Sequence, residues 1–139
     1  MSWLAWALLS AVFAGLTAVL AKVGVSKIDS NLATAIRTTV ILIFTWAIAA
    51  WTLKSGALAA ITRKTWVFLV LSGIATGLSW LCYFRALQLG EVSKVAPIDK
   101  LSVVIAIVFA VIFFGERLSL RESCGAAFIV VGALLLAWK

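Results

Sequence analysis

The sequence is short of the residues on which most enzyme and metal chemistry depends. Its 139 residues include no histidine, one proline, two cysteines and five acidic residues against twelve basic ones. The absence of histidine excludes a Ser-His-Asp triad and a His-ligated zinc site. Cys82 and Cys124 lie in different apolar runs, near opposite ends of their predicted helices, so we expect neither a disulfide nor a metal site. The chain is therefore predicted to be no enzyme and to bind no cofactor.

Charge is scarce as well. Hydrophobic residues make up 65% of the chain and charged residues 12%, with a mean hydropathy of +1.19. A soluble domain carries about a quarter of its residues as charges. A small domain also keeps much of its surface in water, so it cannot hide such an apolar excess in one core. Most of the surface must therefore face lipid.

Five apolar runs are each long enough to cross the hydrocarbon core, which takes about 20 residues of helix. They cover approximately residues 3–21, 32–53, 66–87, 95–114 and 118–138. The polar residues Asp29, Ser30 and Asn31 suit the start of the second helix, and short gaps make neighbouring helices antiparallel. The sequence thus predicts an all-α membrane protein, a bundle of five transmembrane helices forming a single domain over residues 1–139.

An odd number of spans places the two termini on opposite sides of the membrane. The amino-terminal side, side A, would hold Lys54, Arg63, Lys64, Arg117 and Arg121. The opposite side, side B, would hold Lys22, Lys27, Lys94, Lys139 and, at its edge, Arg85. The two sides thus differ by close to zero in their number of basic residues, and it is this difference that sets the orientation of a membrane protein. Two interpretations stay open, a weakly biased single orientation and a dual topology. The basic residues sit mainly between apolar runs, which favours lipid headgroups over nucleic acid as their partners.

Five ionisable residues fall within the spans or at their ends, where charges are costly and usually functional. They are Lys22, Arg37, Arg85, Asp99 and Lys100. At 1.5 Å per residue, Arg37 lies about 9 Å and Asp99 about 7 Å from side B. All five belong to the side B leaflet.

Two interpretations of these charges remain. The groups either snorkel or pair off, Asp99 with Arg37 or Lys100, or they form a cationic pocket that favours an anionic or carboxylate-bearing ligand. Trp80 and Tyr83, near the side B end of the third span, are predicted to line the same cavity. Pro97 reads as an ordinary first-turn proline or as a hinge.

The residues in several of these positions resemble the EamA domain of the drug/metabolite transporter superfamily. The resemblance rests on Tyr83 to Gly90, on Ala96-Pro97-Ile98-Asp99-Lys100-Leu101-Ser102, on Phe114 to Leu118, on Lys22, and on Ser30 to Arg37. It covers essentially the whole chain, and the stretch from Ala96 to Ser102 is similar to the five-helix bacterial/archaeal branch. The resemblance is informative about family and uninformative about substrate.

The resemblance implies half of an inverted-repeat transporter. Larger members resemble two five-helix units in inverted orientation with the substrate cavity between them, so an isolated unit would need a second copy inserted upside down. Helices one to four would line the cavity, and the protein would lie in the inner membrane. Small multidrug-resistance proteins, a related branch, carry a glutamate in helix one. The first span here has no acid, which disfavours proton-coupled efflux of cationic drugs.

Three functions follow as hypotheses. The leading one is a secondary transporter of small polar metabolites, working by alternating access as an antiparallel homodimer. The second is a subunit of a lipid-linked sugar flippase, because a cationic cluster near one leaflet would suit a phosphate. The third is a non-transporting membrane scaffold. The expected partners are a small-molecule substrate, membrane lipid and a second copy of the chain.

Overall fold

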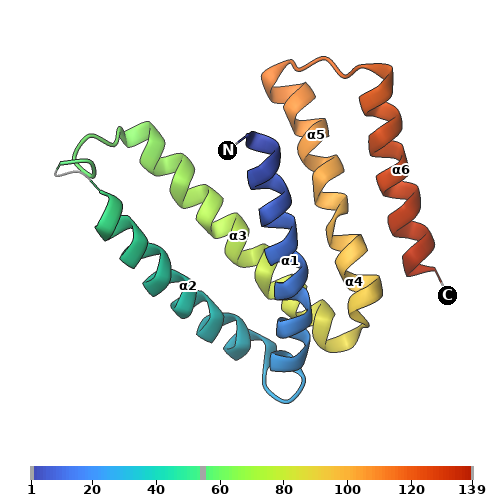
Figure 1. Cartoon of the computed structure of the whole chain (residues 1–139), viewed down its shortest axis with the longest axis horizontal. Coiled ribbons are helices and arrows are strands. Elements are labelled where there is room, and N and C mark those ends of the chain that lie inside the picture. Colours follow the sequence, from blue (N-terminus) through green and yellow to red (C-terminus); the bar gives the residue numbers. More distant parts are fainter. Residues whose placement is uncertain (1, 54–55, 139) are drawn as a thin grey trace. The chain divides into compact units, whose positions relative to one another are not determined.

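The computed structural model describes residues 2–53 and 56–138, and all regular structure within them is helical. The helices are α1 (Trp3–Val25), α2 (Ser30–Thr52), α3 (Arg63–Leu89), α4 (Val92–Asp99), α5 (Leu101–Phe114) and α6 (Leu120–Ala137) (Figure 1). Within these two ranges, five segments are long and apolar enough to cross a membrane, and α4 and α5 together make the fourth. The predicted all-α membrane fold is confirmed. Lys54 and Lys139, counted above as a side A and a side B cation, lie outside the described residues.

Local sequence explains where several helices begin and end. The Asp29 carboxylate accepts hydrogen bonds from the backbone N–H groups of Asn31 and Leu32, at 2.9 and 3.0 Å, and so caps α2. Ser119 and Glu122 form a reciprocal capping box at the start of α6. Gly115 ends α5 with a φ of +66°, a left-handed conformation that costs glycine little.

The fourth span differs from the prediction. We expected one continuous helix over residues 95–114, and the backbone instead breaks at Lys100 into α4 and α5. The hydrogen bonds around the break are short-range: Lys100 N–H donates to the Pro97 carbonyl at 3.1 Å, and Val103 N–H donates to the Lys100 carbonyl at 3.0 Å. These i to i−3 bonds tighten the helix locally, three residues after the single proline.

The chain divides into two compact units, residues 1–22 with 89–139 and residues 23–88. In the first unit, α6 packs along α4 and α5, and Ala133 of α6 is buried, as are Ala18 and Ala21 of α1. Small side chains at such positions let helices approach closely.

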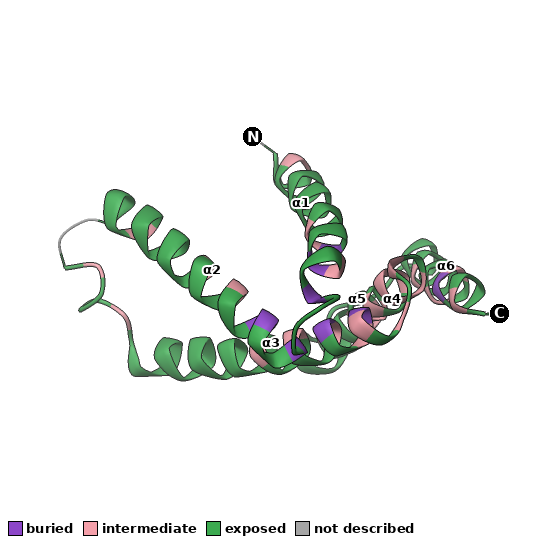
Figure 2. Ribbon diagram, turned by 90° about the horizontal axis from the view of Figure 1, so that it is seen from below, coloured by how far each residue is buried: buried purple, intermediate pink, exposed green. Residues whose placement is uncertain are grey.

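In the second unit, α2 and α3 converge at one end. The buried residues Ser30, Ala33 and Thr34 open α2, and Phe84 and Leu87 lie near the end of α3. Figure 2 shows the two helices closest there and separated toward the loop that joins them. Most of the other large apolar side chains are exposed, and no more than 11% of any span is buried inside the chain. These surfaces must therefore meet lipid or a partner.

Candidate functional site

The Arg37 side chain is the main charged group between α2 and α3. It is seven residues from Ser30, the first residue of α2, which is about two turns or about 10 Å along the axis, and it is half-buried. Its guanidinium carbon lies over the Trp80 ring at 4.4 Å from the centroid, and 5.4 Å from the Phe84 centroid. Both distances are within the range of cation–π attraction.

Arg37 is otherwise uncompensated. Across residues 2–53 and 56–138 the ion pairs join Lys94 to Glu91 and Lys100 to Asp99, and neither involves Arg37. The Arg37 N–H groups form no hydrogen bond with any described residue, although the side chain also interacts electrostatically with Tyr83. Arginine is always protonated in proteins and carries five N–H donors. A full positive charge with an open donor set therefore lies within a membrane span.

Arg85 is engaged by its own helix. Its Nη1 donates a hydrogen bond to Gln88 Oε1 at 2.5 Å, and Gln88 Nε2 donates to the Ile28 carbonyl oxygen at 3.0 Å. This relay ties the end of α3 to the turn between α1 and α2. In the second unit, the structure thus brings together Arg37, Trp80 and Tyr83 among the predicted site residues, and holds Arg85 in a neighbouring polar contact.

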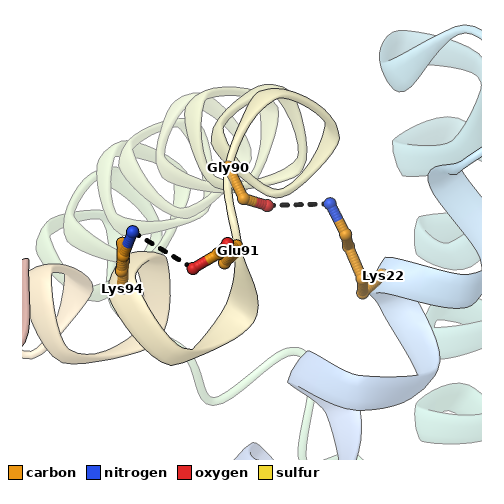
Figure 3. Close-up of polar contacts among 4 residues, drawn as sticks. All are labelled: Lys22, Gly90, Glu91 and Lys94. Atoms are coloured by element: carbon orange, nitrogen blue, oxygen red, sulfur yellow. Dashed lines mark hydrogen bonds and ion pairs between the residues drawn. The ribbon is translucent and has the colours of Figure 1, made fainter.

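In the first unit, Lys22 meets the turn after α3. Its Nζ donates a hydrogen bond to the Gly90 carbonyl oxygen at 2.7 Å, while Lys94 pairs with Glu91 at 3.2 Å (Figure 3). A cation at this position satisfies a carbonyl that the end of a helix leaves without a partner. Lys22 therefore stabilises the link between α1 and the turn that leads into α4.

Asp99 and Lys100 lie at the break between α4 and α5 and pair with each other, Oδ2 to Nζ at 3.6 Å. Of the two pairings that the sequence left open for Asp99, the structure shows the one with Lys100. The pair is electrically neutral. The net positive charge of the five groups is therefore carried by the other three, Lys22, Arg37 and Arg85.

A groove of about 400 Å³ runs between α2 and α3. Asn31, Thr34, Thr38 and Thr39 line one wall, with Gly77 and Leu81 opposite. The three hydroxyls donate to backbone carbonyls four residues earlier, at 2.8, 2.8 and 3.0 Å. The hydroxyl protons of these threonines are therefore engaged by the helix backbone, and the hydroxyl oxygens offer lone pairs to a molecule in the groove.

Sequence reasoning missed Phe84 and the threonine wall. Phe84 follows Trp80 by four residues, so both lie on one face of α3, and this spacing could have indicated a joint contact. Thr34 and Thr38 share one face of α2 for the same reason. Within the part of the chain that the structure describes, no three His, Cys, Asp or Glu side chains group as metal ligands do.

Comparison with protein families agrees with this description. The model of the EamA-like transporter family matches residues 1–138. The chain belongs to the EamA-like transporter family. It is therefore a multi-pass membrane protein of a transporter family, as its five spans require.

Two kinds of curated relative of this EamA-like protein are informative. A Sinorhizobium sp protein described as an uncharacterized transporter in the cobO 3' region is 58% identical over 136 residues, 98% of this chain and 96% of that protein. A probable 4-amino-4-deoxy-L-arabinose-phosphoundecaprenol flippase subunit ArnE from Yersinia pseudotuberculosis is 32% identical over 71 residues. That match covers 51% of this chain and 62% of the relative. No solved structure matches the chain.

Proposed function

We propose that this EamA-like protein is a secondary transporter of small polar, anionic metabolites across the inner membrane, with no catalytic activity of its own. The observation that carries the proposal is Arg37, a cation inside a span whose donors meet no acceptor among the described residues. Charges in membranes are retained where they serve a substrate or ion path. An anion at Arg37 would supply the missing counter-charge.

The substrate site proposed from the sequence comprises Lys22, Arg37, Trp80, Tyr83, Arg85, Asp99 and Lys100. Within it, we propose that Arg37 contacts the anion. The Trp80 ring lies against the Arg37 guanidinium, and Tyr83 interacts electrostatically with the same group. Lys22 donates to the carbonyl oxygen of Gly90, and Arg85 donates to Gln88 within α3. Both would add to the positive charge of the proposed site.

We further propose that the transporter is an antiparallel homodimer of one EamA domain per chain. Five spans put the termini on opposite sides, so a parallel pair cannot reproduce an inverted repeat. The near-equal count of basic residues on the two sides leaves both insertions accessible. The extensive exposed apolar surface of the helices provides area for such a partner. Alternating access would then be a rocking of the two copies around the site.

A thermal-shift screen of metabolites on the purified protein is the first test, because a bound ligand raises apparent stability. Hits are then tested for flux in proteoliposomes. The proposal predicts that anionic compounds stabilise the protein and that they are transported. Stabilisation without flux would instead support a membrane scaffold.

Orientation is tested separately with reporters fused to the carboxyl terminus. Dual topology predicts signal on both sides of the membrane. Signal on a single side would remove the antiparallel homodimer and require an inverted paralogue as the partner.

The alternative is a subunit of a lipid-linked sugar flippase. The similarity to flippase subunit ArnE over 71 residues favours it, and a guanidinium suits a phosphate. Stabilisation that depends on a long-chain lipid phosphate, with no response to its soluble headgroup, would establish the flippase over the metabolite transporter.

A further inference from the structure

The partner of Arg37 in this structure is aromatic. Trp80 and Phe84 take the place that a carboxylate usually fills, at 4.4 and 5.4 Å from the guanidinium carbon. We propose that these two rings form a platform that positions Arg37 as a bidentate site for an oxyanion, a carboxylate or phosphate, with Phe84 as a positioning residue. The inference rests on the proposed function, since it names how the same site selects its ligand.

The geometry of a guanidinium explains why a ring and an anion can share it. The charge is delocalised over a plane, an aromatic ring attracts the face of that plane, and the five N–H donors point outward along its edge. A ring contact therefore holds the group without using its hydrogen bonds. Among the described residues nothing else takes those bonds, so the edge stays available for two parallel bonds to an oxyanion.

The platform is itself fixed. Phe84 is 3% exposed, so packing restricts its ring, and Trp80 lies one helical turn earlier on the same face of α3. On the other helix, Thr34 lies three residues before Arg37 and Thr38 directly after it, and their hydroxyls donate to the carbonyls of Ser30 and Thr34. Neither hydroxyl can donate the same proton to an anion. The N–H groups of Arg37 thus supply the donors to the anion, and their spacing within one plane sets the preference for an oxyanion.

This arrangement predicts selectivity for shape as well as charge. A carboxylate or phosphate presents two oxygens at the spacing of two N–H groups, whereas chloride presents one centre. Lysine at position 37 would keep the charge and lose the planar edge. A ring that only filled space beside Arg37 would affect stability and leave the ratio of oxyanion to chloride affinity unchanged.

The test is a calorimetric titration of the purified full-length protein with inorganic phosphate, acetate and chloride. Wild type should prefer both oxyanions to chloride. Trp80→Leu should weaken oxyanion binding by about 3- to 30-fold and lower that preference, whereas Trp80→Phe, which retains a ring, should stay within about threefold of wild type. Phe84→Leu should have a smaller effect in the same direction, and Arg37→Lys should abolish the preference. Trp66→Leu, at the exposed start of α3, is the matched control and should bind as wild type does.

The outcomes separate the two proposals. If wild type binds neither phosphate nor acetate, the anionic site and the platform are both wrong. If wild type binds them and Trp80→Leu binds equally well, or if Trp80→Phe loses as much as Trp80→Leu, the platform is wrong and the transport proposal stands. Should Trp80→Leu fail to fold, Phe84→Leu and Trp80→Phe decide the matter, because unchanged selectivity in Phe84→Leu contradicts the role given to Phe84.

Discussion

The two units of the chain each hold a cation within a membrane span and compensate it differently. In the first unit, Lys100 pairs with its sequence neighbour Asp99 at 3.6 Å. In the second, Arg37 lies over Trp80 and Phe84 and meets no described carboxylate. One arrangement is neutral and local. The other keeps a net charge and depends on the packing of two helices.

The difference indicates which of the two cations, Lys100 or Arg37, has a functional role. An ion pair between neighbours cancels its own field and lowers the cost of placing either charge in a span. Aromatic faces attract a cation by about 0.5–2 kcal/mol, which is less than the several kcal/mol lost when an ion leaves water. The desolvation of Arg37 thus remains unfavourable in the protein without a ligand, and a bound anion would offset this free-energy cost.

The largest effect is expected from reversing the uncompensated charge. Arg37→Glu should reduce flux of the identified substrate in proteoliposomes by about 100-fold or more, because an oxyanion is repelled and loses two charge-assisted hydrogen bonds. Lys27→Glu, in the exposed turn between α1 and α2, is the control and should leave flux near that of wild type. Equal flux in the two variants would show that Arg37 does not contact the substrate.

Lys22 is an intermediate case, a cation satisfied by a backbone carbonyl. Lys22→Met should lower the free energy of unfolding by about 2 kcal/mol, the usual contribution of a hydrogen bond to a charged group. The measurement is thermal or denaturant unfolding in detergent. Lys27→Met removes a similar side chain from an exposed position and should shift stability by less than about 0.5 kcal/mol. Similar losses of stability in the two variants would show that the effect comes from the loss of a positive charge and not from the contact with Gly90.

In the second unit, Asp29 binds backbone donors in place of a cation. Asp29→Ala should destabilise the protein by about 1 kcal/mol, because the first N–H groups of α2 lose their acceptor, whereas Asp29→Asn should retain most of the stability. Unfolding of both variants checks this. An equal loss for alanine and asparagine would mean that the carboxylate charge matters and the cap does not.

Much of the fold was predictable because its determinants are local. The apolar run lengths predicted five spans, and Asp29 was correctly expected among the capping residues of α2. The sequence left Pro97 open between a first-turn proline and a hinge, and it did not predict the break at Lys100 because periodicity does not register a local tightening of the helix. For the ionisable cluster, the sequence placed five groups in one leaflet and left their partners open.

Those partners depend on tertiary contacts. The Asp99–Lys100 pair lies within the reach of sequence reasoning because the two residues are adjacent. The contact of Arg37 with Trp80 joins residues 43 positions apart, on helices whose crossing the sequence does not specify. Lys22 and Gly90 are separated by 68 residues. Charge counting treats all such cations alike, and packing distinguishes them.

The smallest effect is expected where the charge is already cancelled. Asp99→Asn alone leaves the Lys100 ammonium without its partner and should cost about 0.5–1 kcal/mol of stability, a modest value because both side chains are partly exposed. Asp99→Asn with Lys100→Gln removes both charges and should return stability to near the wild-type value. A double variant whose stability stays as low as that of Asp99→Asn would contradict the view that each charge serves mainly to balance the other. It would show that the Asp99 carboxyl stabilises the protein independently of Lys100.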